Sequence, residues 1–272
     1  MPEYRFETHQ PVNLVVEITK GNVNVRCVET SESTVLVEGK HADDVVVEQH
    51  GDSITVTEPG RGRIFGDTTL RVEIVVPERS NPAVRTGSAD IQVQGVCDHA
   101  QLRSGSGDCT IETVEGHLLV ETGSGDVRAD TVRGNLRVKS GSGDVEVGEV
   151  GGNSSISTGS GDVTVESARS STVVKTGSGD LTIASAHGDT SFSTGSGDAS
   201  IERVERGRLT VKGASGDVSI GVLAGVPVWT DITTVTGTIR SDLQGAGQPQ
   251  EGEDHIEVRA KTVSGDIALS EV

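Results

Sequence analysis

The chain has 272 residues, of which 33% are hydrophobic and 2% aromatic, and this composition argues against a compact globule with many large buried side chains. An excess of 41 acidic over 23 basic residues gives a formal net charge of -18 at pH 7, which argues against nucleic acid or anionic lipid as direct partners. The 36 glycines recur at fixed intervals, which is typical of a repeat protein rather than of a flexible tract.

The first 85 residues are rich in strand-forming side chains but lack the tetrapeptide Gly-Ser-Gly-Asp that dominates the middle of the chain. Segments 19–25 and 50–56 imitate that tetrapeptide and the strand after it, so we expect residues 1–85 to form a β-rich cap continuous with the repeats. The chain does not begin with the basic segment and apolar run of a secretory signal. Alternating apolar residues predict strands over 12–18, 23–28, 34–38, 45–48, 53–57 and 70–76.

Residues 86–223 repeat with a period of 18 residues, which is the signature of a solenoid. Each repeat carries an Asp at the end of its Gly-Ser-Gly-Asp segment or of a variant of it. Degenerate copies follow at 236–238 and 264–266. The repeated residues are Asp90, Asp108, Asp126, Asp144, Asp162, Asp180, Asp198 and Asp217.

Four aliphatic columns follow from this spacing, at positions one, three and six after the Asp and six before it. The alternation predicts a strand with one buried face, and the broken phase after the second column predicts a corner. An aliphatic residue at every sixth position, as in left-handed hexapeptide helices, is not found. We therefore predict an all-β fold, a single elongated right-handed β-solenoid with 18-residue coils and irregular capping coils at both ends.

Residues 224–272 are predicted to form the irregular C-terminal coils and cap. A polar insertion at 245–253 precedes a last strand pair that ends at 267–269. We expect the lone Trp229 to cover the last open coil, because an exposed strand edge would otherwise template end-to-end assembly.

Three features of this layout resemble the bacterial putative-adhesin family of β-strand repeat proteins, a family of unknown function. They are the opening segment 11–17 with 21–23, the run of Thr-Gly-Ser-Gly-Asp-Val repeats, and the ending 252–260 with 264–267. The resemblance covers essentially the whole chain. It implies a β-solenoid without known catalysis.

The Asp column is the most conspicuous candidate site. Calcium bound at the turns is one interpretation; the other is that each carboxylate accepts hydrogen bonds from N–H groups of its own Gly-Ser-Gly turn. We favour the second, because calcium-binding nonapeptide turns would recur twice in every 18 residues. The calcium candidates are Asp108, Asp126, Asp144, Asp162, Asp180 and Asp198.

Other chemistry-bearing residues have a structural interpretation that we favour. His99 and His117 occupy equal positions on successive repeats and could share a metal, but Asn residues continue the same column, as in a corner ladder. Cys109 falls in an apolar column and is expected to be a buried hydrophobe. Glu112 and Asp130 are a carboxylate pair without a predicted cleft, so we expect a solvated face.

One basic loop stands out in this acidic chain. Arg61, Arg63 and Phe65 follow Pro59-Gly60, and Arg and aromatic side chains are favoured anchors of protein interfaces. These three residues are the predicted partner contacts, although a plain surface loop is an equal alternative.

The function predicted from these features is a non-enzymatic, adhesin-like scaffold that binds a protein or another macromolecule along a solenoid face or at this loop. A carbohydrate-active β-helix enzyme and a calcium-dependent adhesion module are the alternatives. We expect no membrane insertion, because no stretch of the sequence approaches the roughly 20 apolar residues needed to cross a membrane. The three cysteines match no disulfide or zinc pattern, so we expect a reduced, cytoplasmic protein. No cofactor is expected. The partner's identity and the oligomeric state are left open.

Overall fold

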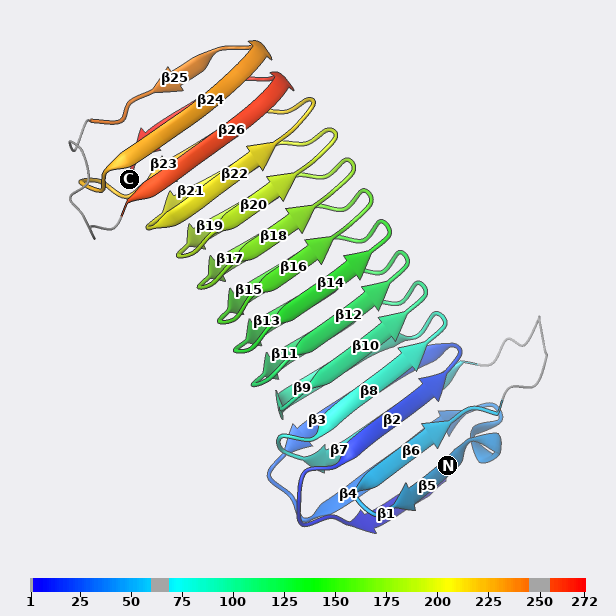
Figure 1. Ribbon diagram of the computed structural model, residues 1–272. Coiled ribbons are helices and arrows are strands. Elements are labelled where there is room, and N and C mark those ends of the chain that lie inside the picture. The colour runs from blue at the N-terminus through cyan, green and yellow to red at the C-terminus, as the bar shows by residue number, and fades with distance from the viewer. Residues whose placement is uncertain (1, 60–68, 245–254) are drawn as a thin grey trace. The chain divides into compact units, whose positions relative to one another are not determined.

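The computed structural model describes residues 2–59, 69–244 and 255–272. Within these ranges the protein is built of β-strands arranged in two sheets, A and B, which confirms the all-β prediction (Figure 1). Contacts divide the chain into two compact units, Met1–Gly134 (unit 1) and Asn135–Val272 (unit 2). The predicted division at residues 85 and 223, the single solenoid and its handedness stay predictions.

Helix is almost absent from the part of the chain that the structure describes. It contains the short 3-10 helix η1 (Ala42–Asp44), and none of its helices is long and apolar enough to span a membrane.

Unit 1 contains strands of both sheets. In spatial order, sheet A has β1 (Glu3–Glu7), β4 (Glu32–Gly39), β7 (Leu70–Pro77), β3 (Gly21–Val28), β9 (Asp90–Cys97), β11 (Cys109–Val114) and β13 (Val127–Val132). Sheet B has β5 (Val46–His50), β6 (Ser53–Thr57), β2 (Asn13–Ile18), β8 (Asn81–Thr86), β10 (Ala100–Ser104) and β12 (Leu118–Thr122).

The repeats of unit 1 pair in parallel and in register. Cys109 lies beside Val127 in sheet A, and Leu102 lies beside Val120 in sheet B. The offset is one repeat, so equal residues of successive repeats become neighbours across the sheet.

The N-terminal part of unit 1 departs from chain order. Strands β2 and β3 pair on one side with β8 and β9, and on the other side with β6 and β7. Strand β4 then runs antiparallel to β7, and the edge strand β1 runs antiparallel to β4. The segment 50–56, expected to imitate a repeat, instead contains the turn of an antiparallel hairpin in which His50 pairs with Ser53. Gly51 has φ of 63°, a left-handed conformation that such a tight turn requires.

Unit 2 likewise contains strands of both sheets. In spatial order, sheet A has β15 (Val145–Val150), β17 (Val163–Ala168), β19 (Leu181–Ala186), β21 (Ala199–Val204), β23 (Val218–Val222), β27 (Ile267–Glu271) and β25 (Ile239–Ser241). Sheet B has β14 (Leu136–Ser140), β16 (Ser154–Ser157), β18 (Thr172–Lys175), β20 (Thr190–Ser193), β22 (Gly207–Lys212), β26 (Ile256–Ser264) and β24 (Val228–Thr236).

The C-terminal strands of unit 2 are also out of chain order. Strand β26 lies between β22 and β24, and β27 lies between β23 and β25, all in parallel. The last strand pair in the sequence is therefore internal, and β24 and β25 form the edges. The prediction for Trp229 is wrong in this respect: its side chain is 52% exposed beside Arg259 on an outer face, and does not cover the core.

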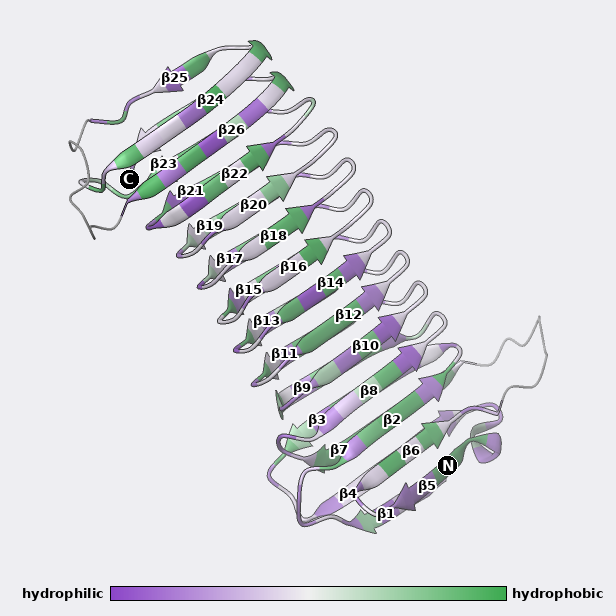
Figure 2. Ribbon diagram, viewed as in Figure 1, coloured by the Kyte–Doolittle hydropathy of each residue, from purple (hydrophilic) through white to green (hydrophobic). Residues whose placement is uncertain are grey.

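The core of each unit is the aliphatic layer between its two sheets. The alternation predicted from the sequence is seen in the burial of Val127 in unit 1 and of Val145 and Val163 in unit 2. Figure 2 shows the matching alternation of hydrophobic and hydrophilic residues along the strands. Phe192 on β20 is the largest fully buried side chain described in unit 2, and it lies between Val174 and Val211 in its column.

Close stacking of the turns explains the second glycine of each Gly-Ser-Gly-Asp segment. A Cβ atom on Gly125 would lie 2.1 Å from the carbonyl oxygen of Gly107, and one on Gly107 would lie equally close to the oxygen of Ala89. No side chain fits at that distance, so the repeat requires glycine there.

Candidate functional site

The Gly-Ser-Gly-Asp turns form a polar edge with recurring hydrogen bonds. A hydroxyl at the end of the preceding strand closes several of the turns: the N–H of Gly107 donates to Ser104 Oγ at 2.8 Å, and that of Gly125 to Thr122 Oγ1 at 3.1 Å. The hydroxyls of Ser104 and Thr122 are buried. In unit 2 the equivalent hydroxyls of Thr176 and Thr194 have no hydrogen-bond partner.

Each Asp of the column then joins its turn to the next. The N–H of Asp126 donates to Asp108 Oδ1 at 2.9 Å in unit 1, and the N–H of Asp180 donates to Asp162 Oδ1 at 2.8 Å in unit 2. The predicted donor was the Asp's own turn; the observed donor is the equivalent Asp of the next repeat. In-register parallel pairing is the reason. Equivalent residues of successive repeats lie one strand spacing apart, about 4.8 Å, so the N–H of each Asp lies within reach of the carboxylate of the equivalent Asp in the preceding repeat.

The described ranges contain no group of three or more His, Cys, Asp or Glu side chains arranged to hold a metal ion. The calcium sites at the six Asp residues therefore stay a prediction without a preformed ligand cluster. The contacts of this column join repeats to one another.

The His99 corner has the same character. The N–H of His99 donates to Asn81 Oδ1, and the N–H of His117 donates to His99 Nδ1 at 2.9 Å. The two imidazole rings lie 5.2 Å apart between centroids and are tilted by 40°. One ring nitrogen of His99 is thus used to link neighbouring repeats.

All three cysteines are free and buried. Burial raises the pKa of Cys109 to about 12, and the negative charges of Asp108 and Asp90 act in the same direction. A thiol with so high a pKa is a poor nucleophile at neutral pH, which agrees with the expected structural role of Cys109.

The carboxylate pair weighed for catalysis is engaged in structural contacts. Glu112 Oε2 accepts a hydrogen bond from the N–H of Gly95 at 2.7 Å, and Asp130 lies 3.3 Å from Arg128 Nε. Arg61, Arg63 and Phe65, the predicted partner contacts, lie outside the described residues.

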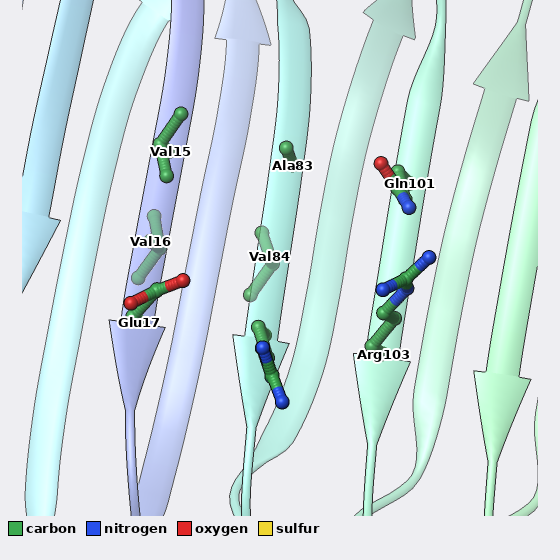
Figure 3. A pocket seen from close by; sticks show the side chains of 8 residues that line it. Val15, Val16, Glu17, Ala83, Val84, Gln101 and Arg103 are labelled. Atoms are coloured by element: carbon green, nitrogen blue, oxygen red, sulfur yellow. The ribbon is translucent and has the colours of Figure 1, made fainter.

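A shallow hollow of about 140 Å³ lies on the outer face of sheet B in unit 1, across β2, β8 and β10. In register, Val15, Ala83 and Gln101 form one row across these strands. Ala83 is the smallest of the three, so the middle of the row is depressed. Figure 3 shows Val15 and Gln101 on either side of Ala83.

The second row of the hollow is charged. It consists of Glu17, Arg85 and Arg103, which are neighbours across the same three strands. Arg103 Nε also lies 3.1 Å from Glu121 of β12. The hollow therefore offers a small apolar depression beside both signs of charge, which suits contact with a polar macromolecule and provides no desolvated acid–base pair.

The sequence interpretation missed these six residues, although a signal was present. Segment 19–25 was recognised as an imitation of the repeat. In the structure Asn22 of this segment pairs with Asp90. Extending the same offset towards the N-terminus places Glu17 beside Arg85 and Val15 beside Ala83, as observed.

The model of the family Toastrack DUF4097 matches residues 12–186 and 167–271 of the chain. Among solved structures, a putative adhesin from Bacteroides fragilis is 11% identical, with a TM-score of 0.42 and coverage of 99% of this chain and 96% of the other. A putative adhesin from Parabacteroides distasonis is 14% identical (TM-score 0.37, coverage 99% and 96%). A putative lipid binding protein from the same species is 11% identical (TM-score 0.37, coverage 100% and 96%). No curated protein matches the chain.

Proposed function

Since the chain belongs to the Toastrack DUF4097 family, we propose that it is a non-enzymatic, adhesin-like scaffold that holds a macromolecular partner on the outer face of sheet B in unit 1. The observation that supports this proposal is the hollow at Ala83, with Glu17, Arg85 and Arg103 beside it. In an acidic chain, two neighbouring arginines next to a depression form a distinctive contact surface.

The strands below the hollow make it a firm platform. Leu14, Val16, Val84 and Leu102 are buried beneath it, while the outward side chains alternate with them along the same strands. A surface held in register by parallel strands loses little conformational entropy on binding, which favours recognition of a partner.

The finer description of the fold belongs to the same proposal. We propose a right-handed β-solenoid with 18-residue coils over the repeats 86–223, an N-terminal cap over 1–85 and a C-terminal cap over 224–272. The free, buried cysteines support the cytoplasm as the proposed location.

The test uses a photo-crosslinking residue placed at Gln101, beside the hollow, in the full chain expressed in its native host. The matched control position is Ser155, which occupies the same place in a repeat of unit 2, beside Arg137 of the preceding strand. We expect one recurrent crosslinked macromolecule from Gln101 and none from Ser155. The double variant Arg85→Glu/Arg103→Glu should lose it while keeping the native circular dichroism spectrum.

Equal crosslinking from both positions, or crosslinking that survives the double variant, would contradict the proposed face. Turnover of glycans by the purified chain would instead favour the β-helix enzyme. A rise in Tm at millimolar calcium, lost in Asp162→Asn, would favour the calcium-dependent module.

A further inference from the structure

The free edge of sheet B in unit 2 differs from an ordinary protected edge strand. Strand β24 pairs with β26 on one side, and no described strand pairs with its other side. Its nine residues include a single charged side chain, Asp231. Natural proteins usually protect long edge strands with charges, prolines or bulges, because unpaired N–H and C=O groups invite another strand.

The exposed apolar residues of β24 are symmetric about its centre. Ile232 is the middle residue; Trp229 stands three positions before it and Val235 three positions after it. Trp229 is 52% exposed and Val235 is 71% exposed. All the outward residues of the strand lie on the face away from the core, because their neighbours Thr230, Ile232 and Thr234 pair with buried residues of β26.

We propose that β24 pairs with β24 of a second copy of this chain, antiparallel, around a twofold axis at Ile232. In that register Trp229 of one copy packs on Val235 of the other, twice. The two Ile232 side chains meet on the inner face. Such an isologous contact closes after two copies, as most homodimer contacts do.

The charges on β24 and its neighbour fit a second copy of the same chain. Asp231 of one copy stands opposite Thr233 of the other, so no like charges face each other across the new pair. Each Asp231 keeps its own cation, because Lys261 Nζ lies 3.5 Å from its carboxylate. The net charge of -18 on each copy opposes association, and the paired β24 strands add no contact between like charges to it.

The first test changes charge at the twofold. Thr233→Asp places an aspartate opposite Asp231 of the second copy, twice. Within one chain it adds a carboxylate beside Lys261 and two residues from Asp231 on the same face. We expect the dimer dissociation constant, measured by analytical ultracentrifugation, to rise about tenfold. The matched control, Ser157→Asp, lies on an outer face between Lys139 and Lys175 and should leave the constant unchanged.

The second test uses Ile232→Cys in the full chain. Residues at a twofold in antiparallel strands are within disulfide distance, so mild oxidation should give a covalent dimer. The native cysteines are buried and do not compete. The control Ser157→Cys should stay monomeric on a non-reducing gel.

A wild-type chain that sediments as a monomer across the concentration series, with no crosslink from Ile232→Cys, overturns the proposal. A dimer that ignores Thr233→Asp and leaves Ile232→Cys reduced also overturns it, because a different surface is then used. Neither test involves the hollow at Ala83, so the outcome is independent of the proposed function.

Discussion

At both ends of the chain, strands are threaded between strands from elsewhere in the sequence, yet the two outer edges differ. At the N-terminal end β2 and β3 lie inside, and at the C-terminal end β26 and β27 lie inside. This threading pairs each of these strands on both sides, which protects it from fraying. The N-terminal end adds antiparallel strands beyond it, whereas the C-terminal end stops at the parallel strands β24 and β25.

The edge strands differ in chemistry as well as direction. The exposed side chains of β1 are Glu3, Arg5 and Glu7, while Tyr4 and Phe6 are half-buried beside the buried residues Val35 and Ser33 of β4. On β24 the exposed side chains include Trp229 and Val235. An edge with charges outside and aromatics inside is protected; a nearly neutral edge with exposed apolar residues is available for pairing.

The largest expected effect is a difference in thiol reactivity between the two units. All three native cysteines belong to unit 1, and an exposed cysteine can be introduced into unit 2 for comparison. Burial raises the pKa of Cys27, Cys97 and Cys109 from 9.0 to about 12. We expect alkylation of the folded chain at pH 8 to be about a thousandfold slower than in urea, because at a fixed pH the thiolate fraction falls about tenfold for each unit by which the pKa rises. Mass spectrometry over time measures it, with the exposed site of Ser157→Cys in unit 2 as the fast control. Rapid labelling of the native cysteines would show that unit 1 opens readily.

The next effect compares the two edges directly. Phe6→Ala should lower the free energy of unfolding by about 1–3 kcal/mol, because a half-buried ring is lost over the N-terminal core. The matched change on β25, which is the C-terminal edge of sheet A as β1 is its N-terminal edge, is Ile239→Ala. It should cost less than about 1 kcal/mol, since that side chain is already 47% exposed. Urea unfolding at low protein concentration measures both. Equal losses would remove the distinction between a closed and an open end.

A smaller effect is expected for Trp229→Ala. The indole contacts Arg259, whose guanidinium carbon lies 5.5 Å from the ring centroid, and an exposed cation–π contact contributes about 0.5–1 kcal/mol. Unfolding of the monomer should therefore change by no more than that amount. A loss of several kcal/mol would restore the capping role that the sequence indicated.

The smallest effect concerns acid stability at the C-terminal end. A hydrogen bond from Arg208 lowers the pKa of Glu257, and a second one from Arg259 adds to it. The folded state thus stabilises the carboxylate. This contribution is complete above the ordinary pKa of a glutamate and is lost as the pH falls through the lowered folded value.

Glu257→Gln should consequently flatten the decline of the urea midpoint below the ordinary carboxyl pKa. Arg208→Gln should have a similar effect, because it removes the largest cause of the shift. A decline that is as steep in both variants as in the wild type would mean that this exposed cluster contributes nothing measurable.

The 18-residue period was sufficient to predict the all-β class, the parallel neighbours and the buried columns, because in-register stacking turns equal spacing in the sequence into contact in space. The Asp column was identified on the same basis. The donor to each Asp was misassigned, because a bond to the next repeat depends on how the turns stack and not on the turn itself.

The order of strands at both ends was decided by tertiary structure. No local feature of segments 13–28 or 256–271 indicates that their strands insert between strands from elsewhere in the sequence. The strand order depends on which pairing buries the most apolar surface. The hollow at Ala83 depends on the same choice, because Glu17 and Arg85 are 68 residues apart and meet only once β2 lies beside β8. The period of the sequence determines how the strands of the repeats pair. The strand order at the two ends is determined by which pairing covers the apolar core that the repeats leave open.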